Sequence, residues 1–286
     1  MTARRSSFER SNVRRNPSER RTAALWPGVL ALVWCLVGPS LAAQSRDPLE
    51  RARVLYNQRQ YTEALSAAEE AARIPARADS ANLIAARAFL ERYRESAATE
   101  DLTNARDRLR TLNTEGFSPT ERVEYVIGLG ETLFFDGLPG AAAAIFGAVV
   151  SGPDLLTPAA RDGLLDWWAS AIDRDARRQP DIERRAIYQR ILDRMEVELG
   201  ANPGSAAASY WLAAGAWGQG DLSAAWDAAL AGWVRAGLTV DQNADLRGDL
   251  DRLMLRGIIP ERAKATAQPV DIVRAEWERF KERWSR

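Results

Sequence analysis

The sequence contains no histidine, only one cysteine and only two lysines among its 286 residues. The cysteine, Cys35, lies in an apolar stretch near the N-terminus, so the chain after it carries neither a thiol nor an imidazole. These absences exclude Ser-His-Asp triads, Cys-His dyads, disulfides and ordinary zinc sites from that part of the chain. We therefore expect no enzymatic activity, no metal ion and no cofactor, although carboxylates, hydroxyls, lysine and arginine remain available for chemistry.

The formal net charge is zero, but the charge is distributed unevenly along the chain. Residues 1–43 carry seven arginines against two glutamates, which leaves the rest of the chain mildly acidic. A mildly acidic protein has no general attraction for the phosphate backbone of nucleic acids. Nucleic acid is therefore not expected as a partner.

The first 43 residues combine a basic leader, an apolar core and an exit of small residues, which is typical of a secretory signal. Ser40 and the small residues that follow it predict cleavage near Ala42 or Ala43. The alternative is an uncleaved anchor in the inner membrane, because residues 23–43 are just long enough to span a bilayer, at about 20 residues. Either interpretation places the rest of the chain outside the cytoplasmic membrane, most simply in a bacterial periplasm.

Beyond residue 46 the apolar residues follow a helical period, and no sustained alternation typical of strands is present. Ser118, Pro119 and Glu121 form the pattern of a capping box at the start of one helix. Gly220 and Asp221 predict a turn between two helices, because glycine adopts positive φ and aspartate caps the helix that follows. We therefore expect an all-α fold.

The helices also repeat in a recognisable order. The segment "ARVLYNQRQYTEALSAAEEAARIP" has a small residue, Ala52, in its first helix, Tyr61 at the turn and Pro75 at the end. The segments "GLGETLFFDGLPGAAAAIFGAVV" and "YWLAAGAWGQGDLSAAWDAALAGWVRAGL" follow the same scheme, and two further pairs fit it loosely. In these features the chain resembles the tetratricopeptide (TPR) repeat family, over most of residues 47–238.

The resemblance implies a right-handed α-solenoid of about five helix-turn-helix pairs in residues 47–238. Its units are irregular, about 37–44 residues long against the family's typical length of about 34. Residues 239–286 depart from the pattern and are expected to form helices that cap the array. The small residues expected at the second-helix contacts are Ala64, Ala105, Ala142, Ala186 and Ala225.

TPR arrays bind peptides or protein segments, so the resemblance implies a non-enzymatic scaffold that holds a protein or peptide partner in the cell envelope. The candidate partner-binding residues are Trp167, Trp168, Trp217, Arg235 and Trp277. One alternative is a glycan-binding or cell-wall-binding module that uses exposed tryptophans. Another is a structural subunit of an envelope assembly that docks through the last helix.

A helical hydrolase or lyase built on carboxylates is a further alternative. The acidic residues of one helix and its turn are the candidates for such chemistry, but their spacing favours a solvated face. These residues are Glu121, Glu124, Glu131 and Asp136.

Overall fold

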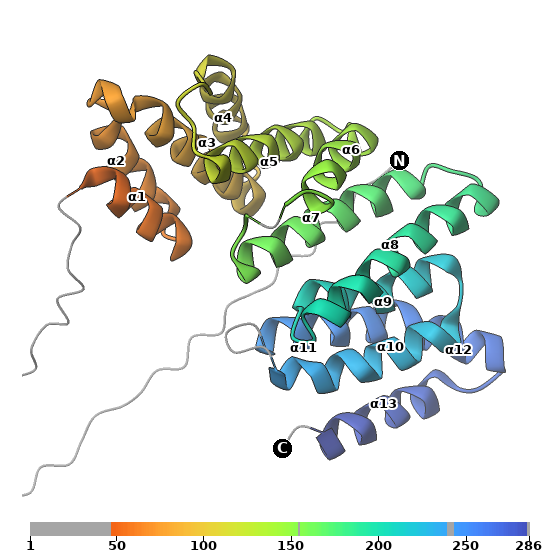
Figure 1. Ribbon diagram of the computed structural model, residues 1–286. Coiled ribbons are helices and arrows are strands. Elements are labelled where there is room, and N and C mark those ends of the chain that lie inside the picture. Colours follow the sequence, from red (N-terminus) through yellow and green to blue (C-terminus); the bar gives the residue numbers. More distant parts are fainter. Residues whose placement is uncertain (1–46, 154, 239–242, 285–286) are drawn as a thin grey trace, which may run out of the picture. The chain divides into compact units, whose positions relative to one another are not determined.

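The computed structural model describes residues 47–153, 155–238 and 243–284 of the chain. Within these residues the chain forms helices and turns and no β-strand (Figure 1), so the prediction of an all-α fold is confirmed for them. The predicted leader or anchor, residues 1–43, lies outside the described residues. None of the described helices is both long and apolar enough to cross a membrane.

The helices of the array pack in neighbouring pairs, each against the next helix along the chain. Two short 3₁₀ turns, η1 (Pro75–Arg77) and η2 (Ala236–Leu238), join or extend them. The helices are α1 (Pro48–Asn57), α2 (Tyr61–Ala72), α3 (Ala78–Ser96), α4 (Thr99–Thr111), α5 (Pro119–Phe135), α6 (Pro139–Val150), α7 (Pro158–Ala176), α8 (Asp181–Ala201), α9 (Ala206–Gln219) and α10 (Leu222–Arg235).

Consecutive odd-numbered helices are also in contact with one another. α1 contacts α3, α3 contacts α5, α5 contacts α7, α7 contacts α9, and α9 contacts α11 (Asn243–Leu253). Among the described residues, no two consecutive even-numbered helices of this array pack together to a similar extent. The odd-numbered helices therefore lie closer to one another than the even-numbered helices do.

Both helix starts that the sequence predicts have the expected geometry. The Ser118 hydroxyl accepts a hydrogen bond from the backbone N–H of Glu121, and the Glu121 carboxylate accepts one from the backbone N–H of Ser118. Gly220 has φ +84°, and the Asp221 side chain accepts the backbone N–H of Ala224 at 2.9 Å. These caps satisfy N–H groups that a helix leaves without partners in its first turn.

The buried apolar side chains form two clusters. The first runs from Ala52 to Phe117 and covers α1 to α4 and the loop before α5, and the second runs from Ile127 to Trp277. Helix α5 contributes side chains to both. On the first cluster it packs Tyr125, Leu129 and Phe135, and on the second it packs Val123, Leu133 and Phe134.

Large side chains fill the space beside glycines on neighbouring helices. A Cβ atom at Gly130 of α5 would lie 2.5 Å from the ring of Phe146 on α6, and one at Gly218 of α9 would lie 2.3 Å from the ring of Tyr188 on α8. Real Cβ contacts are not this short, so only glycine fits at these two positions. Close approach of backbone to an aromatic ring is how these helix pairs reach a high packing density.

Four of the alanines expected at second-helix contacts are fully buried, namely Ala64, Ala105, Ala142 and Ala225. The prediction is wrong for Ala186, which is exposed on α8. At the contact between α8 and α9 the small residues come from α9 instead. A Cβ atom at Gly215 would lie 3.0 Å from Leu192, and Gly218 faces Tyr188, so α8 supplies the large side chains there.

The last helices pack onto the end of the array. α11 contacts α9 and α10, a π-helical turn, η3 (Met254–Ile258), leads into α12 (Ile259–Thr266), and α13 (Val270–Trp284) contacts α10 and α12. Trp277 of α13 is 0% exposed, packs edge-on against Trp233 of α10 and donates its indole N–H to Asp251 at 2.8 Å. The buried leucines of α11 are Leu246, Leu250 and Leu253. Whether residues 239–286 serve as a cap stays a prediction.

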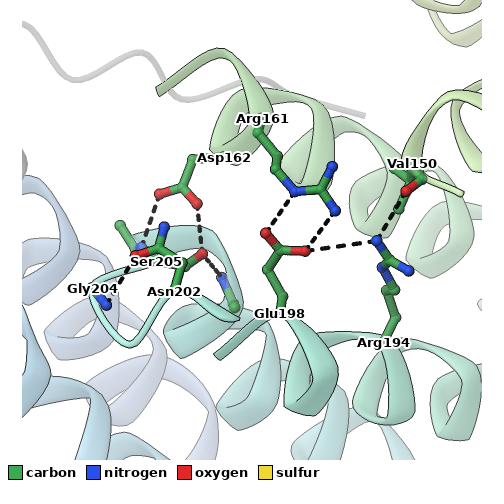
Figure 2. Close-up of polar contacts among 10 residues, drawn as sticks. Val150, Arg161, Asp162, Arg194, Glu198, Asn202, Gly204 and Ser205 are labelled. Atoms are coloured by element: carbon green, nitrogen blue, oxygen red, sulfur yellow. Dashed lines mark hydrogen bonds and ion pairs between the residues drawn. The ribbon is translucent and has the colours of Figure 1, made fainter. Parts of the chain in front are cut away.

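A buried carboxylate, Glu198, joins α7 to α8 (Figure 2). Its two oxygens accept hydrogen bonds from Nε and Nη2 of Arg161 at 2.7 and 2.9 Å, and Nη2 of Arg194 lies 3.6 Å from Oε2. Arg194 also donates to the carbonyl oxygen of Val150 at 2.9 Å, which links α8 to the end of α6. A buried carboxylate needs such partners, because an unpaired charge in the interior is strongly destabilising.

A second carboxylate in the same region joins α7 to the start of α9. Asp162 accepts the Ser205 hydroxyl at 2.5 Å and the backbone N–H of Ala206 at 2.9 Å (Figure 2). Burial raises the pKa of Asp162, and the hydrogen bonds from these two residues oppose the rise. Together the Glu198 and Asp162 contacts fix the positions of three consecutive helices.

Candidate functional site

Side chains of the odd-numbered helices meet and form a polar and aromatic surface. We call this surface the odd-helix face and define it by Tyr56 of α1, Arg87 and Arg94 of α3, Glu124 of α5 and Asp166 of α7. The guanidinium carbon of Arg87 lies 4.8 Å from the ring centre of Tyr56, and Nη1 of Arg87 lies 3.6 Å from Glu124 Oε1. Nη2 of Arg94 lies 4.0 Å from Asp166 Oδ2. Side chains of α3 thus connect α1, α5 and α7.

A cavity of about 120 Å³ opens on this face between α1, α3 and the start of α5. This is well below the roughly 300–1,000 Å³ of sites that enclose whole small molecules. Because two arginines and two glutamates line it, the wall is nearly neutral and rich in hydrogen-bonding groups. Such a cavity suits one side chain of a larger partner. Its lining residues are Arg53, Tyr56, Asn57, Ile84, Arg87, Ser118, Thr120, Glu121 and Glu124.

The wall on the α5 side is held in place by Glu121. Besides its place in the capping box with Ser118, Glu121 accepts a hydrogen bond from Nη2 of Arg53 at 2.6 Å. Burial alone would raise the pKa of Glu121, but hydrogen bonds from Ser80 and Ser118 and the charge of Arg53 outweigh it and lower the pKa. Glu121 therefore stays ionised near neutral pH and ties α5 to α1.

Arg87 has hydrogen-bonding capacity that the protein does not use. Its Nε is buried and has no hydrogen-bond partner among the described residues. Burial alone would lower the pKa of Arg87, but the surrounding acidic groups, including Glu124 at 3.6 Å, outweigh it and raise the pKa, so the guanidinium keeps its charge. Burial also raises the pKa of Tyr56, which therefore remains a neutral hydroxyl.

Glu131 lies deeper on the same side of α5 and is 2% exposed. No described residue forms a hydrogen bond or an ion pair with its carboxyl group. Burial, together with the nearby charge of Glu91, raises the pKa of Glu131 to about 8, against the opposing charges of Arg87 and Arg94. At neutral pH the carboxyl group is therefore mostly protonated.

An aromatic group continues the face beside Arg94. The guanidinium carbon of Arg94 lies 5.2 Å from the ring centre of Trp167, whose ring meets Phe134 and Phe135 edge-on at 5.2 and 5.5 Å and stacks on Phe146 at 6.1 Å. Trp167 is half-buried, so part of its ring faces solvent. A cation over an indole and a partly exposed ring can contact a partner's apolar side chains.

At the α7 end the face becomes acidic. Asp166 accepts the indole N–H of Trp211 on α9 at 3.0 Å. Burial raises the pKa of Asp166, while the hydrogen bond from Trp211 and the charge of Arg94 oppose the rise and Asp249 of α11 adds to it. The charge of Asp249 on α11 is therefore felt by Asp166 on α7.

The structure distributes the predicted partner-binding residues over several helices. Trp167 is on the odd-helix face, whereas its neighbour Trp168 is only 6% exposed and points to another cavity of α7. Trp217 is half-buried beside Gly257, where a Cβ atom would lie 2.9 Å from the indole. Arg235, at the end of α10, is partly exposed, and Trp277 is fully buried in α13. These residues do not form one surface, and their role in binding a partner stays a prediction.

No pattern in the sequence singles out Tyr56 or Arg87, and Glu131 is marked only as one of several acidic residues of α5. The expectation that the acidic residues of α5 form a solvated face is wrong for Glu121 and Glu131, which are 8% and 2% exposed. The sequence signal for the burial of Glu131 is its position in the helix. Glu131 lies between Gly130 and the apolar end of α5, where helical periodicity places it toward α3.

The described residues contain no group of three or more acidic, histidine or cysteine side chains placed to hold a metal ion. Searches against family models, curated proteins and solved structures find no match to this chain.

Proposed function

We propose that residues 47–238 form a TPR-like right-handed solenoid that acts as a non-enzymatic scaffold. In this proposal the chain is exported to the cell envelope through its N-terminal segment, and the odd-helix face binds a protein or peptide segment. The observation that carries the proposal is the contact between each odd-numbered helix and the next. Since the odd-numbered helices are in closer contact with one another than the even-numbered helices are, we infer that the array curves toward the odd-helix face.

The chemistry of this face supports a polypeptide partner. It offers a cavity for one side chain, a partly exposed indole at Trp167, and the charged guanidinium of Arg87 in the cavity wall. These groups are spread along α1 to α7, so they suit an extended segment that makes several small contacts. The array can hold such a segment without a deep pocket.

Burial of the tryptophans argues against the glycan-binding alternative. Five of them are at most 8% exposed and so offer little ring surface on which a sugar could stack, namely Trp168, Trp211, Trp226, Trp233 and Trp277. The docking alternative for the last helix is weakened in the same way, because Trp277 packs inside the chain. We therefore retain the scaffold as the proposed function.

Site-specific photo-cross-linking in the native cell tests the proposal. A photoreactive residue replaces Asn57, which is exposed and lines the cavity, and in a matched variant it replaces Asp107, which is exposed on α4. We expect a recurrent protein adduct from position 57 and none from position 107. Mass spectrometry identifies the partner and the segment that is attached.

A second pair of variants connects the adduct to the chemistry of the face. Arg87→Gln should reduce the adduct at position 57 by about tenfold, as expected for a lost charged hydrogen bond. Arg184→Gln, a change of the same kind on α8, should leave it unchanged. Equal labelling from positions 57 and 107, or no protein adduct at either, would refute the proposal.

A further inference from the structure

A second cavity, of about 280 Å³, lies between α6, α7 and α8. Its lining shares no residue with the cavity on the odd-helix face, so the two cavities are distinct. Trp168 of α7 and the alanines and glycine of α6 form its apolar walls, and Arg190 and Arg194 of α8 form its charged wall. Ser151, directly after α6, adds a hydroxyl.

The two arginines give this cavity a positive charge that the protein neutralises only in part, through the ion pair of Arg194 with Glu198 at 3.6 Å. They are four residues apart on α8 and so lie on the same side of the helix. None of the described lining residues carries a carboxylate. Arg190 makes no hydrogen bond or ion pair with any residue that the structure describes, and the nearest acid to Arg194, Glu198, already accepts two hydrogen bonds from Arg161 (Figure 2).

Arg194 itself is held in a fixed orientation. Its Nη2 donates to the carbonyl oxygen of Val150 at 2.9 Å, as Figure 2 shows, while its buried Nε has no partner among the described residues. The guanidinium is therefore positioned before any ligand arrives. A donor held in advance loses little conformational freedom on binding.

Trp168 supplies a third donor to the same cavity. Trp168 is only 6% exposed, and its indole N–H donates a hydrogen bond to no described residue. The residue opposite is Gly147 of α6, where a Cβ atom would lie only 3.2 Å from Nε1. Glycine at this position keeps the space beside the N–H open. Because Trp168 lines the cavity, this N–H is available to a molecule bound there.

Two guanidinium groups, an indole N–H and a hydroxyl form a set of donors with no carboxylate among the described lining residues. Planar guanidinium groups match the oxygens of carboxylate and phosphate. The volume exceeds that of a bare anion, since a water molecule in the liquid takes about 30 Å³, and the remaining walls are apolar. We propose that this cavity binds a small organic oxyanion, a carboxylate or phosphate monoester with a short apolar group, between α6 and α8.

Solution NMR of the purified protein tests this site directly. The indole N–H resonance of Trp168, assigned by its loss in Trp168→Phe, is followed during titration with sodium butyrate, butyl phosphate or inorganic phosphate at constant ionic strength. We expect a saturable shift of this resonance with an organic anion. Tighter binding of butyrate identifies a carboxylate as the preferred group, and tighter binding of butyl phosphate identifies a phosphate.

Two variants test the site without removing its structural contacts. Arg190→Gln removes the arginine that has no partner among the described residues, and Gly147→Ala places a methyl group against the indole N–H. Each should weaken binding by about tenfold or more. The matched controls are Arg184→Gln on α8 and Gly163→Ala on α7, a position with no neighbouring atom within 4 Å of a Cβ. Both should bind as the unaltered protein does.

Three results would overturn the inference. The first is a shift that sodium chloride produces equally. The second is binding that Arg190→Gln and Gly147→Ala leave intact. The third is inorganic phosphate binding as tightly as either organic anion, which would contradict the role of the apolar walls. Thermal melts of all variants show whether a lost signal reflects lost folding.

Discussion

Glu131 provides the sharpest test of the energetics, because its burial predicts a stability that falls as the pH rises. Below pH 4.5, the ordinary pKa of a glutamate, the carboxyl group is protonated in both the folded and the unfolded chain. Between pH 4.5 and about 8 the unfolded chain loses this proton while the folded chain keeps it. The free energy of unfolding therefore decreases across this interval and levels off above it.

The loss of stability can be calculated from the difference between the two pKa values of Glu131. One pKa unit corresponds to about 1.4 kcal/mol, so the full shift of Glu131 amounts to about 5 kcal/mol as an upper bound. Glu131→Gln keeps the shape of the side chain and removes the titration. We expect this variant to match the unaltered protein near pH 4.5 and to exceed it by several kcal/mol near pH 8.5.

Urea unfolding between pH 4.5 and pH 9, followed by circular dichroism, measures both proteins. The matched control is Glu196→Gln on α8, because the side chain of Glu196 is exposed. The stability of this variant should equal that of the unaltered protein at every pH. If the difference between Glu131→Gln and the unaltered protein does not change with pH, the carboxyl group is ionised in the folded state and the reasoning fails.

The remaining predictions concern packing and the buried charge. Gly218→Ala should destabilise by about 1–3 kcal/mol because its methyl group meets the ring of Tyr188, whereas Gly163→Ala should stabilise by about 0.5–1 kcal/mol, both read from urea midpoints. Glu198→Ala should cost about 3–5 kcal/mol, since it leaves two partly buried arginines without their carboxylate; an unchanged midpoint would contradict this. Trp277→Ala should cost about 3–5 kcal/mol in the same assay, and a near-neutral result would show that α13 does not stabilise the array.

Local signals predict the helices of this chain well. Ser118 with Glu121 and Gly220 with Asp221 define helix ends through interactions within a few residues, so the sequence is sufficient to place them. The buried alanines of α2, α4, α6 and α10 are also visible from periodicity. Ala186 shows the limit of prediction from one helix alone. Either helix of a pair can supply the small residues at their contact, and the sequence of one helix does not say which does.

The candidate site could be predicted only in part. Of the predicted partner-binding residues, Trp167 is half-buried, whereas Trp168 and Trp277 are buried by helices that are distant in the sequence. The burial and the pKa shifts of Arg87 and Glu131 depend on α1, α3 and α5 together. Charge spacing along a single helix does not contain that information, and so it indicated a solvated face for a carboxyl group that is enclosed.

Helix α5 has a further consequence, because its side chains complete both apolar clusters. A chain emerging from the ribosome presents α1 to α4 first, and their cluster gains its last wall only when residues up to Phe135 are free. The second cluster needs the same helix and also Trp277, more than a hundred residues later. The first apolar cluster can therefore close early in synthesis. The side of α5 that belongs to the second cluster stays uncovered until the later helices have been made. Loss of α13 would likewise open the second interior and leave the first closed.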